Sequence, residues 1–138
     1  MTGRVVPEKY QRLRSFAFGD CAALADELLE LVLAGTKTAT CSTEDEPNIS
    51  RPGESWIVLD GQGDPRCVIE TLEVSFRRYG EVDAKFAFDE GEGDRTLAYW
   101  REAHRRYFER AGKFREDMIL MCERFRLVEI FADDRVTS

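Results

Sequence analysis

Long runs of apolar residues are missing from this sequence, and so is an apolar leader. None of the 138 residues lies in an uncharged apolar stretch of the roughly 20 residues that a membrane-spanning helix needs. The first segment, residues 1–11, has no apolar core of the kind found in secretory signal peptides. We therefore expect a cytoplasmic protein with no membrane partner. The apolar share of 43% and the aromatic share of 11% are typical of a globular domain.

Metal-binding motifs are missing as well. The chain has one histidine, His104, and its four cysteines (Cys21, Cys41, Cys67 and Cys122) are scattered without a C-x-x-C pair. Zinc sites normally combine several His and Cys ligands at short spacings. We therefore expect no metal centre and no cofactor. The cysteines are expected to be reduced and buried or half-buried, because Cys packs as a small hydrophobe.

Positive charge is scarce. Lys and Arg number 20 against 27 Asp and Glu, which gives a formal net charge of −7. Proteins that hold long nucleic acids through their phosphates normally present a basic face, so we expect no binding of long DNA. The segment 81–94 is acidic, whereas the basic residues cluster further along the chain. One end of the molecule is therefore expected to be locally positive; the cluster consists of Arg101, Arg105, Arg106, Arg110, Lys113 and Arg115.

Two amphipathic segments predict helices. Residues 20–34 carry leucines at helical spacing, with Asp20 placed to act as the N-cap and Gly35 placed for a left-handed C-terminal cap. A second helix is expected to begin at Asp94 or the next residue and to run to residue 110. We interpret Asp94 as the N-cap of this second helix rather than as a catalytic acid.

Three other segments predict strands. Residues 56–59 and 66–74 flank a turn rich in Gly and Pro and together indicate a hairpin, in which Trp56 packs inside. Residues 118–131 alternate enough to form a long closing strand. The connections are too short for a doubly wound parallel fold. We therefore predict one α+β domain over 1–138, a small curved sheet or β-barrel flanked by two main helices.

The stretch GTKTAT, residues 35–40, places one lysine among three threonines at the end of the first predicted helix. A loop rich in acidic and polar residues follows it. Two interpretations are open. The stretch is either an ordinary helix stop that runs into a strand, or a place where an amine and hydroxyl groups are gathered for chemistry.

The segments that surround this stretch have a recognisable order. They read FAFGD (16–20), ADELLELVLAGTKTAT (25–40), RPGESWIVLDGQGDP (51–65), CVIETLEV (67–74), EGEGDRTLAYWREAH (90–104) and CERFRLVEIF (122–131). In this order they resemble the ASCH domain, a small β-barrel related to the PUA domains that contact RNA. The resemblance covers nearly all of residues 16–131. Its specific part is the G-x-K-x-x-T segment combined with EGEGD and the Leu, Trp and His that follow.

The resemblance implies a barrel with a cleft on one side, lined by the G-x-K-x-x-T loop. Some members of the family resemble RNA-binding modules or ribonucleases. Others are amidohydrolases that remove acyl groups from the exocyclic amine of cytosine nucleosides, using a lysine, a threonine and a glutamate. Carried over by motif, these residues are Lys37, Thr40 and a glutamate of the EGEG segment, where the spacing to Leu97 favours Glu92 over Glu90.

Two physical conditions apply to this catalytic set. A lysine acts as a base only when its pKa is lowered, whereas a nearby carboxylate raises the pKa of an amine. A tight Lys37–Glu92 pair would therefore make Lys37 the group that polarises a carbonyl and leave the glutamate to activate water. In addition, Lys37 and Thr40 meet only if the backbone bends, because side chains three apart on a strand point to opposite faces. We predict a turn or bulge at 36–39 and a strand that starts no earlier than Thr40.

Further residues are candidates for ligand contacts. Phe18 and Gly19 offer a flat wall and a close backbone approach for a base, or else start the first helix. Trp100 and His104 share a helix face and either bind a ligand or belong to the core. The remaining candidates are Ser42, Glu90, and the pair Arg101 and Arg105, which either hold a phosphate or only solvate their helix.

Three functions from different classes remain open. The first is a hydrolase that acts on a modified nucleoside, without metal or cofactor. The second is an RNA-binding module, with or without ribonuclease activity, that contacts short RNA through the basic cluster. The third is a non-catalytic sensor of a nucleotide-like metabolite. The net negative charge favours the first, because a neutral nucleoside needs a pocket and not a track for phosphates.

Overall fold

The computed structural model describes residues 6–43 and 50–132. The two chain ends and the polar loop expected after residue 43 lie outside the described residues. In chain order the elements are a 3-10 turn (Glu8–Tyr10), β1 (Ser15–Ala17), α1 (Ala22–Leu33), β2 (Ala39–Thr43), β3 (Ser55–Leu59), β4 (Pro65–Arg78), a second 3-10 turn (Tyr79–Glu81), α2 (Ala84–Glu90), α3 (Leu97–Arg110) and β5 (Ile119–Ile130).

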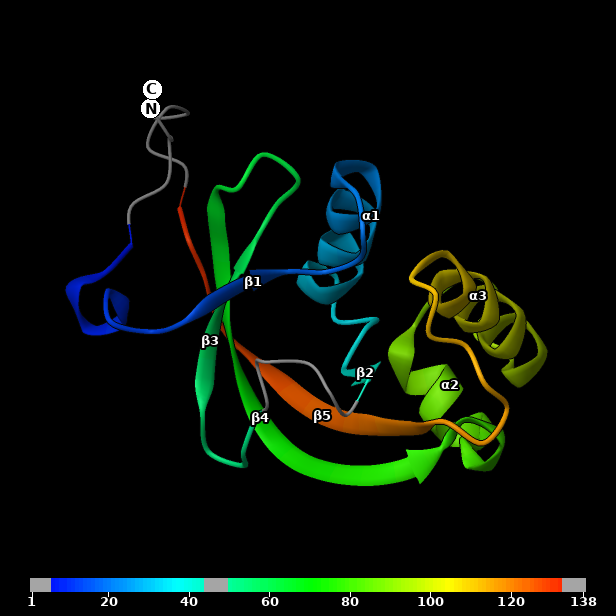
Figure 1. Cartoon of the computed structure of the whole chain (residues 1–138). Helices are drawn as coiled ribbons and strands as arrows, with labels where there is room; N and C mark the ends of the chain where they lie inside the picture. The colour runs from blue at the N-terminus through cyan, green and yellow to red at the C-terminus, as the bar shows by residue number, and fades with distance from the viewer. Residues whose placement is uncertain (1–5, 44–49, 133–138) are drawn as a thin grey trace.

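The strands form one curled sheet in the order β1-β3-β4-β5-β2. The pair β1 and β3 is parallel and the other neighbours are antiparallel. The long strands β4 and β5 bend along their length (Figure 1), and their register shifts twice, at Leu72 and between Val68 and Ile69. Such bulges increase the local twist and bend a strand. The sheet is thus a half-barrel, and the predicted α+β class is confirmed.

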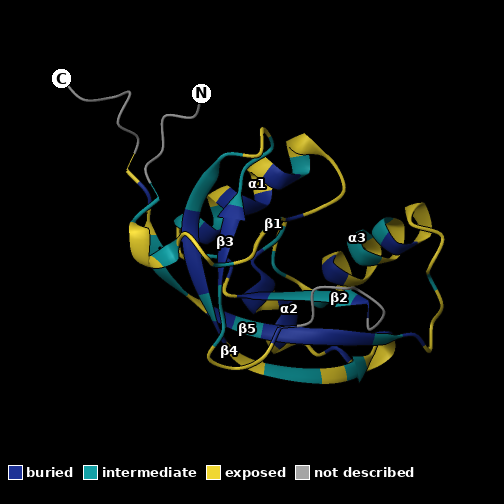
Figure 2. Ribbon diagram, turned by 60° about the vertical axis from the view of Figure 1, so that its left-hand side comes forward, coloured by how far each residue is buried: buried dark blue, intermediate teal, exposed yellow. Residues whose placement is uncertain are grey.

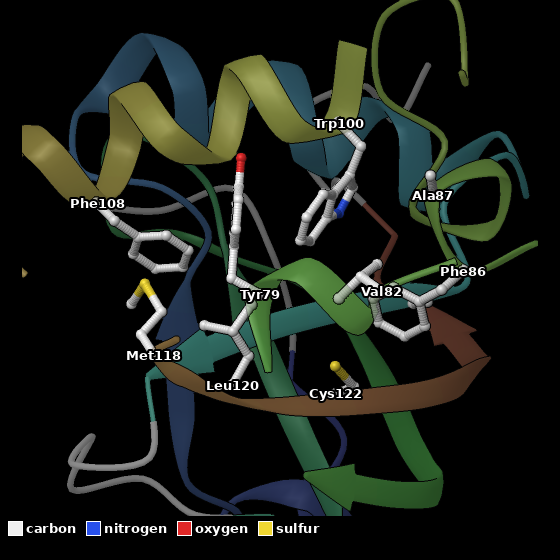
Figure 3. Packing of buried hydrophobic residues seen from close by; sticks show 10 residues of the cluster. Tyr79, Val82, Phe86, Ala87, Trp100, Phe108, Met118, Leu120 and Cys122 are labelled. Carbon is white, nitrogen blue, oxygen red and sulfur yellow. The ribbon is translucent and has the colours of Figure 1, made fainter. Parts of the chain in front are cut away.

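The helices cover two parts of the curled sheet (Figure 1). Beside α1, apolar residues of the helix pack against Trp56, Ile69 and Phe125 from the strands. Beside α2 and α3, a second cluster joins Phe86, Trp100 and residues of β5, with Tyr79 between them (Figure 3). In Figure 2 the buried residues run along the strands, while the outward sides of the helices are exposed. The site described below lies where these two clusters meet.

Both predicted helices exist, but neither begins with the predicted cap. The N-cap of α1 is Cys21, and the carboxylate of Asp20 instead accepts a hydrogen bond from the Arg110 side chain at 3.0 Å. The N-cap of α3 is Thr96, whose hydroxyl accepts from a backbone N–H of the first turn. Asp94 accepts from the Thr96 hydroxyl at 2.6 Å, so it orients the capping residue rather than capping the helix itself.

Besides the two 3-10 turns, one strand and one helix were not predicted. The short strand β1 adds one edge to the sheet. The helix α2 lies inside the acidic segment 81–94, where no helix was expected; its first turn is capped by Asp83, whose carboxylate accepts from the Phe86 backbone N–H at 2.9 Å. Strand β4 also runs four residues beyond its predicted end. The main difference from the predicted pair of helices is therefore α2, which carries Glu90 at its last position.

Two other expectations concern the state of the cysteines and the absence of a membrane-spanning helix. All four cysteines are free, and three of them are buried or half-buried as predicted, but Cys21 is exposed. It is exposed because it is the N-cap at the start of α1. Within the described residues, every helix is too short or too polar to cross a membrane.

Candidate active site

The segment between α1 and β2 brings Lys37 inward. Gly35 has a φ of +81°, as predicted for a left-handed cap. The Lys37 backbone N–H donates back to the carbonyl of Leu31 at 3.0 Å, and the Thr38 N–H donates to the carbonyl of Asp89 at 2.8 Å. The chain is therefore not a strand at residues 36–38, and it bends as predicted. Strand β2 begins at Ala39, one residue earlier than predicted.

The end of α2 presses directly against this segment. Gly91 has a φ of +76°, and a Cβ placed there would lie 2.6 Å from the carbonyl oxygen of Thr36 and 3.1 Å from the Cα of Lys37. Only glycine permits both this left-handed conformation and this close approach. The contact holds the residues on either side of Gly91, Glu90 and Glu92, beside Lys37.

The ammonium group of Lys37 lies between the two carboxylates. The residue is only 1% exposed, and its Nζ donates to Glu90 Oε1 at 3.0 Å and to Glu92 Oε2 at 2.9 Å. A third hydrogen bond, at 3.4 Å, reaches the backbone carbonyl of Glu90. The side chain of Glu90 is 1% exposed, whereas that of Glu92 is 17% exposed. Glu90 is therefore an internal partner, and Glu92 still reaches solvent.

The second oxygen of Glu90 faces α3. Trp100 Nε1 donates to Glu90 Oε2 at 2.6 Å, and the indole nitrogen lies on the side of the ring toward α2 (Figure 3). His104 Nε2 lies 3.5 Å from the same oxygen. The imidazole stacks on the indole at 4.3 Å between ring centres, and its Nδ1 donates to the backbone carbonyl of Trp100 at 2.9 Å. Both carboxylate oxygens of Glu90 are therefore occupied.

The charges of this network hold one another in their ionised forms. Burial by itself lowers the pKa of Lys37, but Glu90 and Glu92 raise it above its ordinary value. Burial likewise raises the pKa of Glu90, but Lys37 and then His104 bring it well below its usual range. The pKa of His104 is lowered by burial and raised, on balance, by Glu90. Lys37 is thus a permanent cation, which excludes it as a general base at neutral pH.

A cavity of two adjoining lobes opens beside this network. The charged lobe, about 390 Å³, is lined by Lys37, Glu90, Glu92 and His104 among others. The aromatic lobe, about 240 Å³, is lined on its own side by Phe16, Ser42, Ser50, Trp56, Met121 and Glu123. The lining residues that both lobes share are Phe18, Gly19, Thr40, Cys41 and Tyr107.

Most of the residues predicted from the sequence line this cavity. The three catalytic candidates border the charged lobe together with Glu90, His104, Phe18 and Gly19, and Ser42 borders the aromatic lobe. Trp100 does not line either lobe; it is 2% exposed and lies behind Glu90. Its contribution is therefore to hold Glu90, and the core interpretation of this residue is the one the structure supports.

Arg101 and Arg105 do not line the cavity. Arg105 is half exposed, pairs with Glu109 at 3.2 Å and lies over the ring of Phe114. The two arginines follow Trp100 and His104 by one residue each, and one residue turns a helix position by about 100°. The cavity is instead bordered by Arg106 and Arg110 of the same helix.

Several lining residues were not predicted. Tyr107 lies three residues after His104 on α3, so helical spacing places it on the same face as that candidate. Cys41 lies next to Thr40 in the motif. Glu123 had no such signal, because an isolated Glu in a strand usually faces solvent; here it is buried and borders the aromatic lobe.

One group of side chains has the composition of a metal site. Cys41 from β2, Glu90 from α2 and His104 from α3 each offer a ligand atom, and the three atoms lie within 4.8 Å of one another. Linear spacing does not predict this group. However, the ammonium of Lys37 already bonds to Glu90, and burial together with Glu90 raises the pKa of the Cys41 thiol well above its ordinary value. A metal would have to displace the ammonium and deprotonate the thiol, so the donors do not form a ready site.

Comparison with known proteins gives a family and, among others, two similar solved structures. A family model described as ASCH domain matches residues 14–129. The chain is similar to the crystal structure of an ASCH domain from Lactobacillus crispatus JV V101, at 35% identity and a TM-score of 0.78, over 93% of this chain and 87% of that one. A protein from Enterococcus faecalis V583 is also similar, at 35% identity and a TM-score of 0.80, over 90% and 81% of the two chains. No curated protein matches the sequence.

Proposed function

The chain belongs to the ASCH domain family, and on this premise we propose that it is a hydrolase that cleaves the amide of acylated cytosine nucleosides. The observation that carries the proposal is the buried ammonium of Lys37, fixed between two carboxylates at the wall of a cavity that Thr40 and Phe18 also line. A fixed cation, a carboxylate that reaches solvent and an adjoining apolar wall are the parts that hydrolysis of a heteroaromatic amide requires.

Lys37 supplies electrostatic stabilisation. When water attacks an amide carbonyl, negative charge develops on the carbonyl oxygen, and a pre-oriented cation in a site of low dielectric stabilises that charge. Lys37 is held by three hydrogen bonds, so it does not need to reorient during the reaction. The raised pKa of Lys37, caused by Glu90 and Glu92 against the effect of burial, keeps it charged throughout.

Glu92 acts as the base. One of its oxygens pairs with Lys37, and its partial exposure leaves the carboxylate accessible to a water molecule. It takes a proton from the attacking water and returns the proton to the departing exocyclic amine. Glu90 is unsuited to this role, because Lys37, Trp100 and His104 surround both of its oxygens. Thr40 borders both lobes, where its hydroxyl positions the water or the carbonyl.

The cavity also suits a neutral nucleoside better than a nucleic-acid strand. Ligand pockets usually hold about 300–1,000 Å³, and the charged lobe alone, at about 390 Å³, falls in that range.

The positive charges of the basic helix α3 are largely neutralised by neighbouring carboxylates. Arg105 pairs with Glu109, Arg106 with Glu102 and Arg110 with Asp20. These pairs leave little free positive charge on α3 for a phosphate backbone.

Turnover of a panel of N4-acylated cytidines tests the proposal. We expect Glu92→Gln to lower kcat at least about 100-fold, the usual size of a general-base contribution, with an unchanged thermal unfolding profile because Lys37 keeps its bond to Glu90. Lys37→Ala is expected to abolish turnover in the fraction that folds. Glu102→Gln is the matched control, since Glu102 lies on the exposed side of α3 and should leave kcat unchanged.

The same measurements separate the other two functions. Wild-type protein that turns over none of the panel would contradict the hydrolase. RNA affinity that falls steeply with added salt, and that is lost in an Arg101→Ala, Arg105→Ala variant, would then favour the RNA module. Saturable binding of a nucleoside without turnover would favour the sensor.

A further inference from the structure

The aromatic lobe contains a buried carboxyl group that the proposed hydrolysis does not use. Glu123 lies in the middle of β5, where its Cα pairs with Thr40 of β2 and with Val74 of β4. The residue is 6% exposed, and its side chain borders the aromatic lobe. A carboxyl group in such a place is costly unless it is paired or neutral, so its surroundings decide what it can bind.

The groups that face Glu123 are mainly hydroxyls. Thr71 of β4 donates to Glu123 Oε2 at 2.9 Å, and the Ser50 hydroxyl is a second partner. Among the described residues, the charged group that acts on the pKa of Glu123 is the carboxylate of Glu54. Glu54 itself pairs with Arg14. Burial and Glu54 raise the pKa of Glu123 against the opposite effect of the two hydroxyls. In the part of the chain that the structure describes, Glu123 has no ion pair with a Lys or Arg. Glu90, by contrast, is paired with the ammonium of Lys37.

The walls of the lobe suit a flat ring. Phe16 lies edge-on to Phe18 at 4.9 Å and to Trp56 at 5.8 Å between ring centres. Ser42 and Glu123 add polar groups to this apolar lining. The volume of about 240 Å³ lies below the range of about 300–1,000 Å³ typical of drug-sized ligands. A single heteroaromatic ring with one polar edge matches a lobe of this size and lining.

We propose that the aromatic lobe is the subsite for the pyrimidine ring of the substrate and that the carboxyl group of Glu123 is a specificity-determining residue that hydrogen-bonds the polar edge of that ring. The identity of the ring rests on the proposed function. The Thr71 hydroxyl donates to one carboxyl oxygen and the Ser50 hydroxyl is a second partner; because each carboxyl oxygen has two lone pairs, the group can still bind a ligand at the edge of the lobe. In its protonated form, which burial and Glu54 favour, the carboxyl group offers a donor and an acceptor side by side, the complement of the ring nitrogen and the exocyclic N–H of cytosine.

Binding of cytidine, measured by titration calorimetry in the Glu92→Gln background, tests the subsite without requiring turnover. Glu123→Ala is expected to weaken binding at least about tenfold, the loss that an unpaired buried hydrogen-bonding group produces. Glu123→Gln is expected to keep the affinity within about threefold, because the amide retains a donor and an acceptor. With Glu123 present, affinity is expected to fall as pH rises and the carboxyl group loses its donor; with Gln it is expected to be independent of pH.

Each outcome decides one of the two proposals. If acylcytidine is hydrolysed but Glu123→Ala and Glu123→Gln both bind cytidine like the parent, the subsite is wrong and the hydrolase stands. If cytidine binds with the expected pattern but no acylcytidine is hydrolysed, the subsite stands and the hydrolase is wrong. Absence of cytidine binding to the folded parent overturns the subsite. Thermal unfolding of both Glu123 variants shows that a loss of affinity is not a loss of fold.

Discussion

Glu90 and Glu123 lie on two sides of one cavity, and both are almost completely buried. Burial alone raises the pKa of each carboxyl group. Glu90 faces an ammonium, an indole N–H and an imidazole, so its pKa is well below its ordinary range. Glu123 faces hydroxyls and the carboxylate of Glu54, so its pKa is raised. The neighbours thus favour the ionised form of Glu90 and the protonated form of Glu123.

The difference between Glu90 and Glu123 suits the two lobes to different tasks. The charged lobe around Glu90 fixes a cation, which serves a reaction in which negative charge develops. The aromatic lobe holds the carboxyl group of Glu123, which when protonated donates as well as accepts a hydrogen bond and so suits recognition of a polar ring edge. Thr40 and Phe18 lie between the two lobes. A substrate that spans both would place its ring in one lobe and its scissile bond in the other.

Removal of the cation should have the largest effect on stability. Lys37→Met leaves Glu90 and Glu92 without the ammonium that both bind, and loss of one partner of a buried ion pair typically destabilises by about 3–5 kcal/mol. Because the pKa of Glu90 is lowered in the folded protein, the advantage of the wild type is fully present above the unfolded pKa of about 4.3 and is lost as pH falls. Urea unfolding at several pH values measures it.

A second substitution shows whether the uncompensated carboxylate is the cause. In Lys37→Met, Glu90→Gln, the buried charge is gone, and we expect at least half of the lost stability to return. If the double variant is as unstable as the sum of the two single variants, the charges of Lys37 and Glu90 do not stabilise one another, and the contrast between Glu90 and Glu123 loses its electrostatic basis.

The two tryptophans provide a smaller and matched test. Trp100→Phe removes the N–H that donates to Glu90 at 2.6 Å and should destabilise by about 1–3 kcal/mol, because a charged buried acceptor loses a partner. Trp56→Phe is the control: Trp56 is equally buried, but its indole nitrogen has no hydrogen-bond partner among the described residues. Equal losses in the two variants, measured by urea unfolding, would contradict a hydrogen-bond role for Trp100.

The sequence predicted the charged lobe better than the aromatic one. Lys37, Thr40 and Glu92 were proposed through the resemblance to the ASCH domain, and all three border the charged lobe; the bend at residues 36–38 followed from simple strand geometry. The fold class and the long closing strand were also correct, because both depend on hydrophobic patterns that sequence preserves. The helix α2 was not predicted, since it has only seven residues, two of them glutamate or aspartate at the end of an acidic segment.

Interactions between distant segments could not be predicted in this way. The choice between Glu90 and Glu92 as the catalytic glutamate was made from spacing to Leu97, which could not show that the Lys37 ammonium binds both. Arg101 and Arg105 were left as either phosphate contacts or solvating residues, and they do not line the cavity, because periodicity shows that a helix has faces but not which one borders a cavity. Glu123 gave no signal at all. Its burial depends on the curvature of β4 and β5, and that curvature depends on bulges such as the one at Leu72 that the pattern of residues does not mark.

The smallest expected effect comes from Glu123→Gln, which tests the contrast between Glu90 and Glu123 by changing Glu123. The raised pKa of Glu123 means that the folded protein binds this proton more tightly than the unfolded chain. The stability that the group contributes is therefore present below the unfolded pKa of about 4.3 and is lost as pH rises through the folded pKa.

In the Glu123→Gln variant, the glutamine keeps an acceptor for Thr71 and has no proton to lose. We expect the variant to match the wild type at low pH and to be equal to it or more stable at neutral pH, the opposite trend to Lys37→Met. Urea unfolding between pH 4 and 8 measures the difference, and Glu54→Gln, which removes the carboxylate that acts on Glu123, should shift the wild-type curve in the same direction. A variant that is less stable than the wild type at neutral pH and equal to it in acid would mean that Glu123 is held ionised, and its assignment as a donor to the ring would then fail with it.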